Sequence, residues 1–273
     1  MKKFLSLILV LVFLTLSLTA CGKDDSKIVV GATSVPHAEI LEKVKDAMAA
    51  KGYTLEIVIY DDYTLLNPAL QDESILANYF QHVPYLNSFN AESHTDLVSV
   101  AKIHYEPLAL YGDATSKTGN TILVPSDGSN CTRALLLLAE QGYVTLKGNP
   151  TASSNLSDKD IADAKGNNVI LVQADMIPAQ YKQGGTLAVI NGNYALAAGM
   201  NISDAIASES AEGAGAQEYA NIIAVKRGNE NHPAIVALVE ALQSQLVYDY
   251  IVNEYDGAVL PVFTPSVTVA PKN

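Results

Sequence analysis

Residues 28–60, IVVGATSVPHAEILEKVKDAMAAKGYTLEIVIY, decide the fold class of this chain. The apolar run at residues 28–30 and the β-branched run at residues 55–60 are typical of strands. Between them we predict a helix that begins at Pro36 and ends at Gly52, because apolar residues recur at helical spacing. The apolar face of this helix comprises Ile40, Leu41, Val44 and Met48. A strand, a helix and a second strand in this order predict an α/β protein with a mostly parallel sheet.

The same alternation continues through the rest of the chain. The predicted strands lie at residues 75–79, 97–103, 108–111, 121–124, 169–172, 187–190 and 222–225. The predicted helices lie at residues 83–89, 133–141, from Tyr194 onward, and 233–254. Residues 209–217, rich in Ala, Gly and Glu, are predicted to form a loop.

The polar stretch at residues 112–120 is the best candidate for a domain boundary, because a second α/β series begins after it. A strand near residue 222 is available for a return to the first series. We therefore predict two lobes joined by two crossover strands, with a ligand cleft between them. The predicted divisions are lobe 1 at 28–112 plus 221–265, lobe 2 at 113–220, and a C-terminal tail at 266–273.

The N-terminus resembles an export signal. Lys2 and Lys3 precede an apolar run at residues 4–18, which is short for a membrane span. The sequence LTAC that ends at Cys21 resembles the lipobox of bacterial lipoproteins, in which the Cys is lipidated; the alternative is an ordinary signal peptide with an incidental Cys. We expect a signal peptide at 1–20, a lipidated tether at 21–27, and anchoring at the extracytoplasmic face of the cell membrane.

Composition excludes several classes of protein. The 273 residues are 49% hydrophobic and carry a formal charge of −12, which argues against disorder and against a nucleic-acid partner. Loss of Lys2 and Lys3 with the signal would change the charge to −14. Two Cys are too few for a disulfide scaffold. The sequence contains no Walker A, G-x-S-x-G or H-E-x-x-H pattern, so we expect neither an enzyme nor a cofactor.

Several motifs together resemble the NlpA family of lipoproteins, the methionine-binding components of ABC importers. They run through most of the mature chain: VGAT and VPHAEI at 30–40, DY at 62–63, ANYFQHVPYL at 77–86, His104 with Glu106-Pro107, RALLLL at 133–138, VINGNYA at 189–195 and YAN at 219–221. The resemblance implies the type II fold of periplasmic binding proteins, a methionine ligand, and an ABC permease with its ATPase as partners.

A methionine site needs a cation for the carboxylate and oxygen acceptors for the ammonium. Arg133 lies in the first turn of a predicted helix, after a turn that contains Asn130, where a helix N-terminus would also favour an anion. A solvated surface Arg is the alternative from composition alone, but the resemblance implies that Arg133 holds the carboxylate. It also implies that Asn191 and Asn221, both expected at strand ends, bind the amino-acid backbone. We interpret Asn193, beside Gly192, as a turn residue.

The resemblance places an aromatic slot for the thioether at Tyr63, Phe80, His82 and Tyr85. Packed core aromatics are the alternative explanation. The chain departs from the common family pattern around the carboxylate site, where Ser126, Gly128 and Cys131-Thr132 stand. The sequence therefore leaves open L-methionine, D-methionine, a derivative, a methionine-containing dipeptide or another small amino acid.

Two further classes remain as rivals. Three of the five His could meet in space as a zinc site, but a metal site has no use for Arg133 with two Asn residues. A purely structural lipoprotein would not need that constellation either. We interpret His37 as part of a polar helix start and expect no metal ligands and no catalytic residues.

Overall fold

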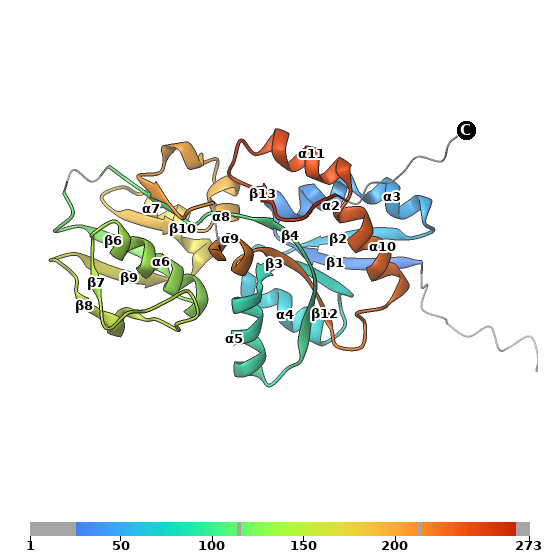
Figure 1. Ribbon diagram of the computed structural model, residues 1–273, viewed down its shortest axis with the longest axis horizontal. Helices are drawn as coiled ribbons and strands as arrows, with labels where there is room; N and C mark the ends of the chain where they lie inside the picture. The colour runs from blue at the N-terminus through green and yellow to red at the C-terminus, as the bar shows by residue number, and fades with distance from the viewer. Residues whose placement is uncertain (1–25, 114–115, 212–213, 266–273) are drawn as a thin grey trace, which may run out of the picture.

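A computed structural model describes residues 26–113, 116–211 and 214–265, which form two α/β lobes side by side (Figure 1). The predicted signal peptide at 1–20, the lipidation site Cys21 and the tail at 266–273 lie outside the described residues. Two sheets, one per lobe, organise the structure, so the predicted α/β class is confirmed.

The strand–helix–strand unit predicted from residues 28–60 is present. β1 (Lys27–Ala32) pairs in parallel with β2 (Thr54–Ile59). The helical segment between them is divided into η1 (Ser34–Ala38), α2 (Glu39–Lys43) and α3 (Lys45–Ala50). Its break falls at Val44, whose ψ is 0°. The predicted apolar face of Ile40, Leu41, Val44 and Met48 is fully buried in the first core.

The first sheet has the strand order β13-β4-β12-β3-β1-β2. Its other strands are β3 (Ala77–His82), β4 (Leu97–Tyr105), β12 (Asn221–Lys226) and β13 (Leu260–Pro261), with α4 (Tyr63–Gln71) and α5 (Val83–Ser93) along the chain. β12 runs antiparallel between β3 and β4, so Asn221 lies opposite both His82 and His104. This register brings the three polar residues together where these interior strands end.

The predicted helical stretch at 233–254 is two helices, α10 (Pro233–Leu242) and α11 (Gln245–Glu254). Ser244 caps the second helix by accepting a hydrogen bond from the Val247 N–H. Both helices contribute to the first core. Within the described ranges no single helix is long and apolar enough to cross a membrane, although this pair, bent by 48°, meets the length and composition criterion when taken together.

The second sheet has the order β11-β5-β10-β6-β9. Its strands are β5 (Ala109–Tyr111), β6 (Thr121–Pro125), β9 (Asn168–Val172), β10 (Leu187–Ile190) and β11 (Ala207–Ser208). A small hairpin joins β7 (Thr145–Leu146) to β8 (Ile161–Asp163). The helical elements of this lobe are α6 (Gly128–Glu140), η2 (Asp158–Asp160), η3 (Ala174–Met176), α7 (Ile177–Tyr181), α8 (Gly192–Ala197), η4 (Ile202–Asp204) and α9 (Ala214–Glu218).

The structure differs from the prediction at three places: the crossing between the sheets, the start of α6 and the predicted loop at 209–217. β5 was predicted in lobe 1, but it pairs with β10 and β11, so the chain enters the second sheet before residue 109 rather than at 112. α6 begins at Gly128, five residues before the predicted start, because the Asp127 carboxylate caps the Asn130 N–H. The predicted loop at 209–217 contains the beginning of α9.

Candidate functional site

A pocket lies between the lobes where strands from both sheets end. It is partly open to solvent, and the side chains that line it leave a cavity of only about 20 Å³ in this structure. All eight residues predicted as ligand contacts line it: Tyr63, Phe80, His82, Tyr85, Asn130, Arg133, Asn191 and Asn221. Gln81, Glu106, Gly192 and Asn193 complete the lining.

The Arg133 side chain is buried in this pocket, with 4% of its surface exposed. Its Nε and Nη2 donate to the two carboxylate oxygens of Glu209 at 2.9 and 2.5 Å. Nη2 also donates to the Glu106 backbone oxygen at 3.0 Å, and Nη1 donates to Asn130 Oδ1 at 3.2 Å. Four of the five guanidinium N–H groups therefore have acceptors among the described residues, and one on Nη1 remains for a ligand.

Glu209, which the sequence analysis placed in a loop, is the counter-ion of Arg133. It also accepts hydrogen bonds from the Tyr105 hydroxyl and from the Leu108 N–H, both at 2.9 Å. Burial alone would raise the pKa of Glu209. The charge and hydrogen bonds of Arg133 have a larger opposite effect and hold that pKa below its ordinary value. The guanidinium also stacks on the Tyr219 ring at 4.5 Å. These contacts fix the cation in one orientation.

His82 and Asn130 join the two lobes across the pocket. His82 Nδ1 accepts the Tyr85 N–H and so caps α5, which leaves Nε2 as the donor to Asn130 Oδ1 at 3.1 Å. The Asn130 amide donates in turn to the Asp127 carboxylate at 3.0 Å. Asn130 thus has hydrogen-bond partners at both ends of its amide. It orients His82 and Arg133 and has little hydrogen-bonding capacity left for a ligand.

Four aromatic side chains pack together beside these polar groups, and three of them, Tyr63, Phe80 and Tyr85, line the pocket. The Tyr63 ring lies 5.5 Å from Phe80, 6.0 Å from Tyr85 and 4.7 Å from Tyr194, measured between ring centroids. Tyr194 supports the Tyr63 ring from outside the pocket, and its hydroxyl donates to the Asp61 backbone oxygen at 2.9 Å across the lobes. Aromatic faces and edges of this kind suit a polarisable sulfur atom.

Besides Asn130, three Asn residues line the pocket, and they differ in their hydrogen bonds. Asn191 Oδ1 is buried and has no hydrogen-bond partner among the described residues, although the side chain is 7% exposed. Asn221 Oδ1 bonds to His37 Nε2 at 3.0 Å. Our interpretation of Asn193 as a turn residue is wrong in part, because its buried Oδ1 accepts the Tyr63 hydroxyl from the other lobe.

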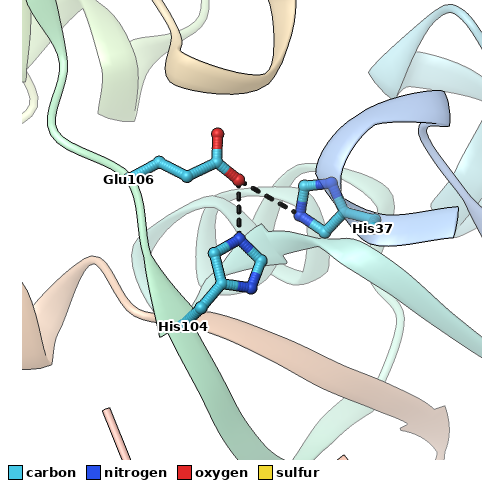
Figure 2. Close-up of side chains that lie close together, drawn as sticks. All are labelled: His37, His104 and Glu106. Carbon is cyan, nitrogen blue, oxygen red and sulfur yellow. Dashed lines mark hydrogen bonds and ion pairs between the residues drawn. The ribbon is translucent and has the colours of Figure 1, made fainter. Parts of the chain in front are cut away.

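His37, His104 and Glu106 form a buried cluster (Figure 2), of which Glu106 also lines the pocket. Glu106 Oε1 is 2.7 Å from His104 Nε2 and 3.5 Å from His37 Nε2. These three atoms lie within 4.8 Å of one another, so this is the set of described residues best placed to hold a metal ion. The prediction of His37 as a polar helix start is wrong about its environment, since only 1% of the side chain is exposed.

Gly192 is required by the position of Glu106. A Cβ at residue 192 would lie 2.8 Å from Glu106 Oε2, closer than real Cβ contacts. Burial raises the pKa of Glu106, while His37, Arg133 and the Asn193 N–H lower it. The sequence indicated Glu106 only as part of a family motif, and its position directly after the last residue of β4 is the signal that could have identified it.

The buried His residues predict an acid-sensitive fold. Burial lowers the pKa of His37 to about 4 and the pKa of His82 to about 3, with Arg133 adding to the second shift. The unfolded chain takes up these protons near pH 6.5, so stability should fall as the pH drops from about 6.5 towards 4, by about 1.4 kcal/mol per pH unit for each such His. Glu106, whose pKa is raised, opposes part of this loss.

Urea unfolding at several pH values measures this slope. We expect His82→Gln, which keeps a donor for Asn130, to reduce the slope by about 1.4 kcal/mol per pH unit. The exposed His94→Gln serves as the control. Equal slopes in the wild type and His82→Gln would contradict the prediction.

The fold and the pocket define a class of protein. Two α/β lobes joined by short crossings, with a buried polar pocket between them, are the architecture of a substrate-binding protein. Comparisons with known proteins then give the family.

The sequence profile of the NlpA lipoprotein family matches residues 28–263. A curated relative, the methionine-binding lipoprotein MetQ of Bacillus subtilis strain 168, is 36% identical over 281 residues, covering 96% of this chain and 99% of the relative. The crystal structure of lipoprotein Tp32 from Treponema pallidum matches with a TM-score of 0.80 and 36% identity, over 87% of this chain and 100% of that one. A nutrient-binding protein from Burkholderia cenocepacia, solved bound to methionine, matches with a TM-score of 0.80 and 34% identity, over 86% and 100%. The chain belongs to the NlpA lipoprotein family.

Proposed function

We propose that this chain captures methionine in the pocket between its lobes and delivers it to an ABC importer. The observation that carries the proposal is the buried, unpartnered Asn191 Oδ1, which lies in the same pocket as the remaining N–H of Arg133 and the aromatic slot. A free amino acid has an anionic end, a cationic end and a side chain, and the pocket offers a complement to each. The names of the relatives support methionine as the amino acid.

Each part of methionine has a candidate partner. The carboxylate would accept the free Nη1–H of Arg133, and the Asn191 and Asn221 amides would bind the backbone of the amino acid. Glu106 adds a carboxyl group to the lining that could receive the ammonium. The thioether would lie among Tyr63, Phe80 and Tyr85. His82 and Asn130 would hold the walls in place from opposite lobes.

The site of action follows from the N-terminus. Lipidation at Cys21 would tether the chain to the extracytoplasmic face of the cell membrane. With a mature charge of −14 the protein gains nothing from an anionic membrane surface, so acyl chains would have to hold it there. Its partners would be a membrane permease and the ATPase that drives it. The protein performs no covalent chemistry in this proposal.

Native mass spectrometry of protein purified without added ligand tests the proposal. We expect a fraction of molecules to carry the mass of one methionine, because the pocket is buried between the lobes. A dipeptide or a metal ion in its place would overturn the assignment of the ligand. If the protein carries nothing, calorimetric titration with L-methionine and D-methionine decides, and the absence of heat with both would overturn the proposal.

The aromatic slot predicts a preference for sulfur over carbon. Norleucine has a methylene group where methionine has its thioether, so the two ligands differ mainly in the contact with the aromatic rings. We expect methionine to bind more tightly by about 0.3–1.5 kcal/mol, which is roughly 2- to 12-fold. Competitive calorimetry measures the ratio, with Val236→Ala, on the exposed side of α10, as the control variant. Equal affinities would show that the rings act only as an apolar wall.

A further inference from the structure

His37 does not line the pocket, but it contacts two residues that do, Asn221 and Glu106. Its Nδ1 is 2.7 Å from the Thr33 hydroxyl oxygen, and its Nε2 is 3.0 Å from Asn221 Oδ1. All three side chains are at most 6% exposed.

The surroundings of His37 determine which ring nitrogen carries the hydrogen. Burial keeps the ring neutral at pH 7, so it has one N–H to donate. Nε2 faces two oxygens, Asn221 Oδ1 and Glu106 Oε1, and the Thr33 hydroxyl beside Nδ1 can itself donate. The network therefore assigns the hydrogen to Nε2 and the accepting lone pair to Nδ1.

His104 directs that hydrogen towards Asn221 rather than Glu106. Its own Nε2 bonds to Glu106 Oε1 at 2.7 Å, and its Nδ1 bonds to the Tyr79 hydroxyl (Figure 2 shows the contact with Glu106). The same carboxylate oxygen is 3.5 Å from His37, which is too long for a strong hydrogen bond. Asn221 is thus the principal acceptor for His37.

Asn221 and Asn191 consequently present opposite ends to the pocket. The Oδ1 of Asn221 is occupied by His37, which leaves its NH₂ group to face a ligand, whereas the Oδ1 of Asn191 has no partner among the described residues. We propose that His37 is a positioning residue that fixes Asn221 as a hydrogen-bond donor for the ligand carboxylate. This inference rests on the proposed function, because it concerns how the same pocket tells the two ends of an amino acid apart.

The distances favour a hydrogen-bonded network over a metal centre at this cluster. Ligand atoms around a tetrahedral zinc ion, each about 2.0–2.2 Å from it, would lie roughly 3.3 Å apart. His104 Nε2 and Glu106 Oε1 are 2.7 Å apart, which is a hydrogen-bond distance. Both His residues also have a partner for every ring nitrogen.

The test compares three ligands in three proteins. Methioninamide lacks the carboxylate and N-acetylmethionine lacks the ammonium, so the ratio of each Kd to that of methionine reports on one end of the ligand. In His37→Leu, Asn221 loses its partner. We therefore expect the first ratio, the Kd of methioninamide divided by the Kd of methionine, to fall about tenfold. The second ratio, the Kd of N-acetylmethionine divided by the Kd of methionine, should change little. His37→Gln, which retains an amide N–H for Asn221, should restore the first ratio.

Three results would overturn the inference. A uniform loss of affinity for all three ligands in His37→Leu would show a merely structural role, as would an unchanged first ratio. Binding of one zinc ion per wild-type protein, lost in His37→Leu, would show a metal centre instead. If His37→Leu does not fold, Thr33→Val removes only the partner of Nδ1, and the first ratio should then shrink less but in the same direction. Failure of the wild type to bind methionine would refute the proposed function itself.

Discussion

Replacement of Arg133 with Ala should lower the free energy of unfolding by about 3 kcal/mol and weaken methionine binding at least tenfold. The structure pairs Arg133 with Glu209, whose side chain is 16% exposed. Removal of one partner leaves a largely buried charge without compensation, which is among the most destabilising changes in a protein. Loss of a charged hydrogen bond to the carboxylate adds about 1.5–3 kcal/mol to the free energy of binding.

A second substitution separates the two effects. In Arg133→Ala with Glu209→Gln the buried charge is gone, so we expect most of the stability to return while methionine binding stays weak. Urea unfolding and calorimetry on the wild type, both single variants and the double variant complete the cycle. Normal methionine affinity in the double variant would contradict a role for Arg133 in binding. Equal instability of the single and double variants would contradict the pairing.

Asn191→Leu should have opposite effects on stability and binding. The Asn191 Oδ1 is buried and has no partner in the described part of the chain, and such a group costs about 1–3 kcal/mol of stability. The side chain makes no capping hydrogen bond to α8, so its removal takes away no helix cap. We therefore expect the protein without ligand to become more stable, by about 1 kcal/mol, and methionine to bind at least tenfold more weakly.

Thermal unfolding with and without methionine measures both quantities. Asn201→Leu, at an exposed position before η4, is the matched control and should leave binding unchanged. If Asn191→Leu bound methionine normally, the unpartnered oxygen would have no role in recognition. If it lost both stability and binding, the Asn191 side chain would be a structural element of the pocket.

The parts of the fold that the sequence predicted are those with regular burial. In the helix after Pro36 every fourth or third residue enters the core, so the pattern is visible along the chain. The start of α6 was missed because Gly128, Ser129 and Asn130 have low helix propensity, and a single Asp127 cap outweighs them. β5 is only three residues long, and its sheet is decided by pairing with strands that come about 80 to 100 residues later.

The residues that line the pocket were easier to predict from sequence than the residues that hold them in place. Arg133, Asn191 and Asn221 followed from family motifs together with the rule that strand ends carry binding residues. Glu209 lies 76 residues from Arg133 in a segment with no periodic pattern, so nothing local indicates their pairing. Asn193 was misjudged because a turn residue and a pocket residue look alike in sequence, and only the Tyr63 hydroxyl from the other lobe tells them apart.

The hydrogen bonds that join the lobes have a consequence for the speed of capture. His82 bonds to Asn130, Tyr63 to Asn193, and Tyr194 to the backbone of Asp61, and all three bonds connect one lobe to the other. The cavity of about 20 Å³ is too small for an amino acid while these contacts hold, so we expect the lobes to open before a ligand enters. The association rate should then level off at high solute concentration, at the rate at which the lobes part. At high ligand concentration the breaking of the tyrosine and histidine contacts, rather than diffusion, would limit the rate at which the protein binds its ligand.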